Sequence, residues 1–317
     1  ALRESRLARM KEMGIVGKDV VAFPGLPKVP GWESLTPEKQ KLSSRRMEIY
    51  AAMLANMDHH IGRVLDQLKA AGKLDNTLVI FFSDNGAEAV ELNALIESVF
   101  SPDAKKWFMA TFDQRPENWG RPGSAVDYGP GWAQAGSVPF RMFKAYVTEG
   151  GIRSPLIIAG PGVKHAGEIN TSFLHVMDIA PTLYEMAGAQ HPSSKPGSKN
   201  APLQGKSLVP LLAGSNDSVR GESDWVGWEL FGNRAVRQGD WKILKLLRAS
   251  GGSGEWQLYN LKNDPGETRD LAKQDPKKLR ELLVLWSRYA KQNGLILNGD
   301  GPFKRGKEAM VEEDLRD

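Results

Sequence analysis

The sequence has 317 residues, a length typical of about two domains. Apolar residues make up 41% and charged residues 25%, which is ordinary for a globular protein and excludes a disordered tail or a fibrous repeat. No run approaches the roughly 18 apolar residues that span a bilayer. The 42 basic and 38 acidic residues nearly balance and form no long basic run, so we expect no nucleic-acid partner. The absence of cysteine excludes disulfides, thiolate metal sites and a cysteine nucleophile.

The first part of the chain predicts a short helix, a Pro/Gly-rich stretch and then one long helix. Thr36, Pro37 and Glu38 have the pattern of an N-cap, a first-turn proline and an acidic first turn. Apolar residues then recur at three- and four-residue steps as far as Leu68, and Gly72 follows. This spacing predicts a long amphipathic helix that ends near Gly72.

A short apolar segment follows the long helix and leads into a polar turn. Residues 77–83 are β-branched, aliphatic or aromatic up to Ser83, which predicts a strand buried on both faces. Ser83, Asp84, Asn85 and Gly86 come next. Ligand sites of open α/β sheets lie at the carboxyl ends of strands, so we expect Asp84 and Asn85 at such a position.

Residues 87–143 have no clean periodicity apart from a predicted helix over 90–100. Irregular insertions of this length are commonly functional loops. Residues 154–163 then predict a second buried strand, and residues 178–188 predict a helix that begins at Asp178 and ends at Gly188.

The composition changes after about residue 220. Three strand-like stretches, with a hairpin turn at residues 238–240, and an amphipathic helix capped by Asp275 predict a small antiparallel α+β unit. We therefore predict an α/β fold with a partial mixed or parallel sheet flanked by helices in residues 1–220. The smaller antiparallel unit would occupy residues 221–317.

Asp84 and Asn85 are the first candidates for chemistry. Asn-Gly after a strand is explained by a turn alone, because both residues tolerate positive φ. A carboxylate beside an amide oxygen also suits a hard cation such as calcium or magnesium, although two ligands are too few for a complete site.

Lys144 is the next candidate, because it lies between the irregular insertion and Gly150–Gly151. A lone lysine is usually a solvated charge, but here it is placed to donate to an anionic group. Ser137–Arg141 has the form Ser-x-Pro-x-Arg, and we interpret that short pattern as chance.

The histidines and tryptophans have simpler structural explanations. His59 and His60 are adjacent on a helix and cannot both bind one ion, and we expect a structural role for His175. The five tryptophans after residue 220 suit either a hydrophobic core or a sugar-binding surface, and we favour the core.

Four ordered segments carry a resemblance to a known family. They are MEIYAAMLANMDHHIGRVLDQLKAAGKLDNTLVIFFSDNGAE, YGPGWAQAGSVPFRMFKAYVTEGGIRSPLIIAGPGV, TSFLHVMDIAPTLYEMAG and WQLYNLKNDPGETRDLA. Together they resemble the C-terminal portion of a type I, formylglycine-dependent sulfatase, close to the bacterial arylsulfatases of the alkaline phosphatase superfamily.

The resemblance implies roles for individual residues. Asp84 and Asn85 would be two ligands of one divalent cation, usually calcium. Lys144 would contact the substrate sulfate, with Glu149 at the expected offset from it. Tyr128 and Trp132, in the insertion, would form part of the pocket wall.

The chain also departs from the family pattern. Formylglycine is made from cysteine or serine in a Cys/Ser-x-Pro-x-Arg motif that precedes the metal turn, whereas Ser137 follows it. We therefore expect the formylglycine and the remaining ligands in an N-terminal half, either a separate chain or a preceding part of the gene product. This chain alone should be inactive.

The expected substrate of the complete enzyme is a small sulfate ester or a sulfated glycan. Loss of the neighbouring half should leave apolar surface exposed around the strand at 77–83. Two alternatives stay open: a phosphate or phosphonate ester hydrolase of the same superfamily, and a non-catalytic glycan-binding module.

Overall fold

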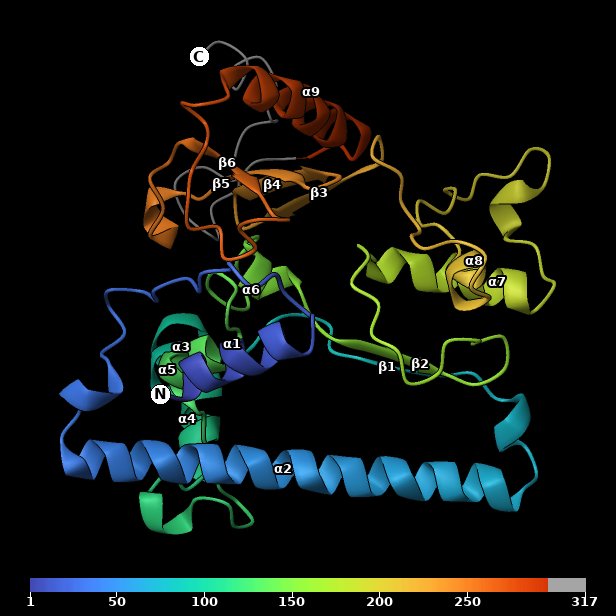
Figure 1. The fold of residues 1–317 in the computed structure, drawn as a ribbon. Coiled ribbons are helices and arrows are strands. Elements are labelled where there is room, and N and C mark those ends of the chain that lie inside the picture. The colour runs from blue at the N-terminus through green and yellow to red at the C-terminus, as the bar shows by residue number, and fades with distance from the viewer. Residues whose placement is uncertain (296–317) are drawn as a thin grey trace.

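The computed structural model describes residues 1–295, without the side chain of Ser98. Its helices are α1 (Leu2–Glu12), α2 (Pro37–Ala70), α3 (Leu92–Val99), α4 (Pro102–Thr111), α5 (Gly129–Gly136), α6 (Glu149–Ile152), α7 (Ile179–Met186), α8 (Val209–Leu212) and α9 (Pro276–Gln292). The strands are β1 (Val79–Phe82), β2 (Leu156–Ala159), β3 (Trp225–Leu230), β4 (Asn233–Gln238), β5 (Trp241–Lys245) and β6 (Trp256–Asn260). Figure 1 shows α2 along one side of the molecule and the β3–β6 sheet with α9 at the opposite end.

The long helix α2 begins and ends where the sequence predicts. The Thr36 side chain accepts a hydrogen bond from the Lys39 amide, and Pro37 occupies the first helical position. The helix ends at Ala70, and Gly72 follows with a φ of 64°, a conformation that glycine adopts without strain. The predicted long helix is therefore confirmed.

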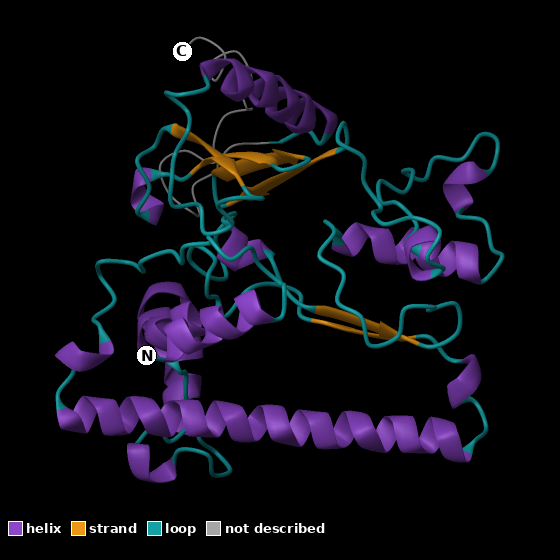
Figure 2. Cartoon of the chain, viewed as in Figure 1, coloured by secondary structure: helices purple, strands orange, loops and turns teal. Residues whose placement is uncertain are grey.

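Both sheets in residues 1–295 are antiparallel (Figure 2). Strand β1 pairs with β2, with Val79 opposite Ala159. No parallel pair occurs in this part of the chain, so the described residues do not provide the mixed or parallel sheet that we expected. The chain reverses direction between the two strands, and β2 is the one partner that β1 has among the described residues.

The prediction that the first strand is buried on both faces is wrong for the described residues. Phe81 and Phe82 are each 39% exposed, and Ile157 on β2 is 61% exposed. The described residues therefore cover these side chains only in part. On α2, Met53 and Val64 are more than half exposed.

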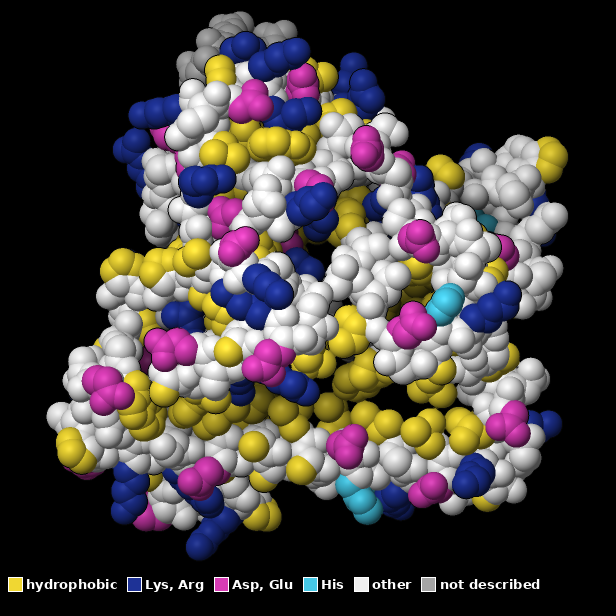
Figure 3. All heavy atoms as spheres, in the orientation of Figure 1, with side chains coloured by type: hydrophobic (Ala, Val, Ile, Leu, Met, Phe, Trp, Pro, Cys, Tyr) yellow, Lys and Arg dark blue, Asp and Glu magenta, His cyan; other side chains and the backbone are white. Residues whose placement is uncertain are grey.

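We call this surface the α2–β1 apolar face. It consists of Met53, Leu54, Met57 and Val64 on α2 and of Phe81 with its cross-strand partner Ile157 on β1 and β2. Figure 3 shows apolar side chains along the side of α2 that faces the β1–β2 pair. The predicted apolar exposure around the first strand is therefore present.

The C-terminal unit has four strands, not three. The predicted hairpin turn at residues 238–240 is confirmed, and it divides the stretch 234–247 into two paired strands, β4 and β5. The strand order is β3-β4-β5-β6, and Asp275 caps α9 by accepting from the Lys278 amide. Part of the predicted second domain, residues 296–317, lies outside the described residues.

The β3–β6 sheet has an apolar layer on each face, as alternation along the strands requires. Val236, Ile243 and Leu258 pack against α9, together with Trp286. Residues of the opposite face pack against the segment 142–147, and these are Ala235, Leu244, Leu246, Tyr259 and Leu261. The sheet therefore supports the segment that carries Lys144.

The tryptophans of the C-terminal unit belong largely to this core. Trp286 is 2% exposed, and Trp225, Trp241 and Trp256 pack partly buried around it. Trp228 lies against the other face of the sheet. This confirms the prediction that they are core residues.

Within residues 1–295, no helix has the length and apolar character needed to span a membrane.

Candidate active site

The turn after β1 lies directly against the Gly150–Gly151 turn at α6. The Gly86 amide donates to the Gly151 carbonyl at 2.9 Å. A Cβ atom on Gly86 would stand 1.8 Å from the Gly150 carbonyl oxygen, far inside any allowed contact. Glycine at position 86 is thus what allows the two turns to meet.

Lys144 is held beside the same turn by its backbone and by its side chain. Its amide donates to the Ala87 carbonyl at 3.0 Å, and its Nζ lies 2.9 Å from Oε2 of Glu88. Both side chains of this ion pair are 44% exposed. The structure therefore brings the predicted metal turn and the predicted sulfate contact together, although they are about sixty residues apart in the sequence.

Glu88 is a residue that the sequence analysis missed. Its Oε1 accepts from the amides of Ala89 and Val90, both at 2.9 Å, which leaves Oε2 directed at Lys144. Partial burial raises the pKa of Glu88, but the Val90 amide and the Lys144 ammonium outweigh it, and the net pKa is lowered. The carboxylate is thus an ionised, oriented partner for Lys144.

Asp84 and Asn85 could provide two of the oxygen ligands of a cation. Asp84 is exposed and Asn85 half-buried, and no described residue makes a hydrogen bond or ion pair with either side chain. A carboxylate and an amide oxygen are hard ligands of the kind that calcium takes, but calcium needs six to eight. In residues 1–295, no group of three or more acidic or histidine side chains is arranged to hold a metal. The two residues therefore fit a shared site and not a complete one.

Glu149, at the start of α6, has a buried structural role. The fully buried Lys242 of β5 lies 2.8 Å from Oε1 of Glu149 and 2.8 Å from Oε1 of Glu267. The Glu149 amide also donates to Oε2 of Glu267. This charged cluster ties α6 to the C-terminal sheet, and the sequence alone gave no signal for it.

The two carboxyl groups of this cluster differ in their pKa shifts. Burial raises the pKa of Glu149, but Lys242 and the nearby Arg237 and Arg153 outweigh it, so the net pKa is lowered. For Glu267, burial and the charge of Glu149 prevail over Lys242, and the pKa is raised. Both directions follow from one buried cation shared by two carboxyl groups.

The predicted wall residues Tyr128 and Trp132 lie in different surroundings. Tyr128 packs with Ala87 and Phe143 beside the turn, and burial raises its pKa to about 12. Trp132 instead donates from its indole to the Ser43 backbone and hydroxyl on α2, at 3.0 and 2.9 Å. Tyr128 is therefore near the candidate site, whereas Trp132 links α5 to α2.

The Ser-x-Pro-x-Arg segment faces the interior. Ser137 is buried at the end of α5, and the Arg141 guanidinium donates to Gln257 and to the Tyr259 hydroxyl, both on β6. These contacts favour its interpretation as a chance pattern.

His175 caps a short 3₁₀ helix by accepting from the Met177 amide, which confirms its structural role.

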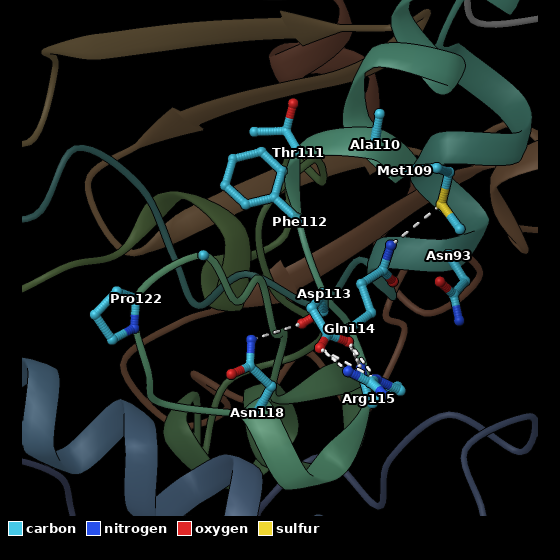
Figure 4. A pocket seen from close by; sticks show the side chains of 11 residues that line it. Asn93, Met109, Ala110, Thr111, Phe112, Asp113, Gln114, Arg115, Asn118 and Pro122 are labelled. Atoms are coloured by element: carbon cyan, nitrogen blue, oxygen red, sulfur yellow. Dashed lines mark hydrogen bonds and ion pairs between the residues drawn. The ribbon is translucent and has the colours of Figure 1, made fainter.

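An open hollow of about 790 Å³ lies elsewhere, beside α3 and α4 (Figure 4). Asp113 and Arg115 in its lining bind each other, and Gln114 donates to the Met109 sulfur. Asp113, Gln114 and Arg115 are thus engaged with neighbours in the hollow. None of the predicted site residues lines it.

Comparison with known proteins places the chain in a family. The model of the sulfatase family matches residues 22–189, more than half of the chain, so the chain belongs to the sulfatase family. A second model, of the C-terminal region of N-sulphoglucosamine sulphohydrolase, matches residues 140–286. Both matches include Lys144.

Individual relatives agree with this assignment. An uncharacterized sulfatase of Schizosaccharomyces pombe is 40% identical over 319 residues, which cover 98% of this chain and 56% of the relative. An arylsulfatase of Klebsiella aerogenes is 38% identical over 218 residues, which cover 68% of this chain and 45% of the relative. The chain thus spans about half the length of these curated relatives.

Solved structures support the fold. The crystal structure of Ps i-CgsB has a TM-score of 0.54 at 20% identity and covers 92% of this chain and 52% of that one. A Bacteroides thetaiotaomicron protein described as a candidate sulfatase has a TM-score of 0.50 at 21% identity, covering 92% of this chain and 59% of that one. At such identities the likeness concerns the fold alone.

Proposed function

We propose that this chain supplies part of the active site of a sulfuric ester hydrolase of the arylsulfatase type. Asp84 and Asn85 would bind one calcium ion, and Lys144 would contact the sulfate group of the substrate. The observation that carries the proposal is the junction at Gly86, which holds the turn against the Gly150–Gly151 backbone and beside Lys144. Membership of the sulfatase family supports the choice of sulfate as the group that is bound.

The calcium ion, when bound, would orient sulfate oxygens and withdraw charge from the reacting group. The residues of this chain have simpler tasks. Asp84 contributes a negative charge and Asn85 a neutral oxygen to the ion. Lys144 offers an ammonium to the charge that develops on the transferred group. The formylglycine nucleophile and the other metal ligands would come from residues outside this chain.

Glu88 would set the resting position of Lys144. Because its Oε1 is fixed by two backbone amides, its Oε2 keeps the ammonium beside the turn. A sulfate group that binds there would compete with Glu88 for the same ammonium. The pair is half-exposed, so this exchange costs little compared with breaking a buried ion pair.

We further propose that the polypeptide carrying the nucleophile packs on the α2–β1 apolar face. Six large apolar side chains on this face are 39–65% exposed, and they extend from α2 to the strands that precede the Asp84 turn and follow Lys144. A partner on this face would therefore bring its residues to the edge of the sheet where Asp84 lies. That partner would be the N-terminal half of the enzyme, as a separate chain or in the same gene product.

Two measurements on the purified chain test the proposal. Calcium added to ¹⁵N-labelled chain should shift the amide signals of residues 84–86, with weak affinity because two ligands are few. Asp84→Ala should abolish these shifts, whereas Asp75→Ala, an exposed aspartate on the other side of β1, should preserve them. The chain alone should not hydrolyse 4-nitrophenyl sulfate. Turnover by the chain alone, or calcium shifts that survive Asp84→Ala, would contradict the proposal.

A further inference from the structure

Helix α9 has one buried face and one strongly basic face. Leu282, Leu283, Trp286 and Ala290 point into the core against the β3–β6 sheet. The opposite face is solvent-exposed and holds Lys277, Arg280, Arg288 and Lys291, with the half-exposed Val284 between them. Figure 3 shows lysine and arginine side chains gathered over this end of the molecule.

Helix α9 carries a local excess of positive charge. α9 contains five basic residues and one acidic residue, a net charge of +4, which equals the net charge of the whole 317-residue chain. Its single acid, Glu281, is bound by Lys278. The other four basic side chains make no ion pair or side-chain hydrogen bond with any described residue. A linear inspection of the sequence misses this concentration, because apolar residues separate the charges.

The other long helix shows that such a face is not a general property of this fold. α2 has six basic and four acidic residues spread over 34 positions. Some of its arginines are paired, Arg45 with Glu48 and Arg46 with Asp127. A surface helix usually mixes charges in this way, and α9 does not.

The basic positions on α9 form a row. From Lys277 to Lys291 the helix rises about 21 Å, at roughly 1.5 Å per residue. Lys273, exposed in the turn before the helix, extends the row toward the N-terminus. A row of this length matches a linear polyanion better than a single small anion, because each cation meets a different charge along the polymer.

We propose that the basic face of α9 binds a sulfated polysaccharide at a site separate from the catalytic one. A guanidinium group can donate two parallel hydrogen bonds to two oxygens of one oxyanion. Arg280 and Arg288 each supply such a guanidinium group. Val284 offers apolar contact to a sugar ring between the two. The choice of a sulfated polymer among polyanions rests on the proposed function.

The position of α9 explains what such binding would do. The helix covers one face of the β3–β6 sheet, and the segment that carries Lys144 packs on the other face. The sheet therefore separates the two surfaces. A polymer held on α9 raises the local concentration of its own sulfate esters around the rest of the molecule, as any second binding point does.

Heparin affinity with two matched variants tests the proposal. In the first variant, Lys277, Arg280, Arg288 and Lys291 are all changed to Gln, a good helix former. In the control, Lys39, Lys41, Lys69 and Lys73 are changed to Gln, which removes the same charge from exposed positions on and beside α2. Each is made in the full chain and in a chain ending at Leu295, so that the acidic side chains of residues 308–317 do not enter the comparison. Circular dichroism verifies the fold of each.

The expected result is specific to α9. The first variant should bind heparin at least tenfold more weakly, and its slope of log affinity against log salt should be less steep by about 2–3, or about 0.7 for each lost contact. The control should bind as the parent does. Equal losses in both variants, or no retention of the parent near physiological salt, would overturn the proposal. Equally tight α9-dependent binding of DNA would overturn the assignment of a sulfated glycan. Because no turnover is measured, this result does not depend on whether the sulfatase chemistry is correct.

Discussion

The junction between the Asp84 turn and α6 depends on the absence of a side chain at Gly86. In Gly86→Ala, the new Cβ would lie 1.8 Å from the Gly150 carbonyl oxygen, so one of the two turns has to move. Forcing atoms into a packed site costs about 1–3 kcal/mol. Separation of the turns also lengthens the hydrogen bond from the Gly86 amide to Gly151, which contributes about 1 kcal/mol. We therefore expect the free energy of unfolding to fall by about 2–4 kcal/mol, the sum of these two costs.

Urea denaturation followed by circular dichroism measures this change. Gly136→Ala is the matched control, because its Cβ would make an ordinary contact at 3.7 Å to Ala87 and the site lies on the exposed side of α5. That change should leave stability equal or raise it by about 0.4–1 kcal/mol. If Gly86→Ala were as stable as the parent, or lost no more than the control, the close approach of the two turns would not be the structural basis of the site.

Two further predictions concern charged groups near the site. The lowered pKa of Glu88 means that its ion pair with Lys144 stabilises the fold above the ordinary carboxyl value of 4.5 and is lost as the pH falls through the lowered value. A ¹³C titration of the Glu88 carboxyl should have its midpoint below 4.5, and Lys144→Met should move it upward; an unchanged midpoint would refute the pairing. Lys242→Met removes the buried cation that Glu149 and Glu267 share and should cost about 3–5 kcal/mol in urea denaturation. Adding Glu149→Gln and Glu267→Gln should recover most of this loss, and a triple variant no more stable than Lys242→Met would argue against the charge explanation.

Local sequence signals predicted where α2 and α9 begin. Thr36–Pro37 and Asp275–Pro276 each place a capping side chain before a proline, and both helices begin there. Such signals involve residues a few positions apart, so the sequence contains all that the local structure needs. Helix α4 was missed, although Ser101–Pro102 has the same capping pattern, because its apolar residues lack a clear stripe.

Contacts between residues that are far apart in the sequence were harder to predict. The predicted metal turn and Lys144 were candidates from their positions in the sequence, and a family resemblance implied their roles. Their proximity depends on Gly86 packing against a backbone more than sixty residues away. The ion pair of Glu88 with Lys144 and the buried Lys242 cluster join residues that no spacing rule connects. The burial predicted for the first strand failed for a related reason. An apolar segment indicates that its side chains favour burial, but the segment does not indicate which other residues cover them.

We propose that Asp84, Asn85 and Lys144 serve sulfate ester hydrolysis. The most direct measurement is turnover by a chimera in which this chain replaces the matching part of the Klebsiella aerogenes arylsulfatase, to which it is 38% identical. The chimera should hydrolyse 4-nitrophenyl sulfate in preference to 4-nitrophenyl phosphate. Asp84→Ala and Lys144→Ala should each lower kcat/KM by at least about a hundredfold, the scale seen when one electrostatic contact to a transition state is removed. A chimera that keeps its sulfatase activity in both variants, or that prefers the phosphate ester, would contradict the account.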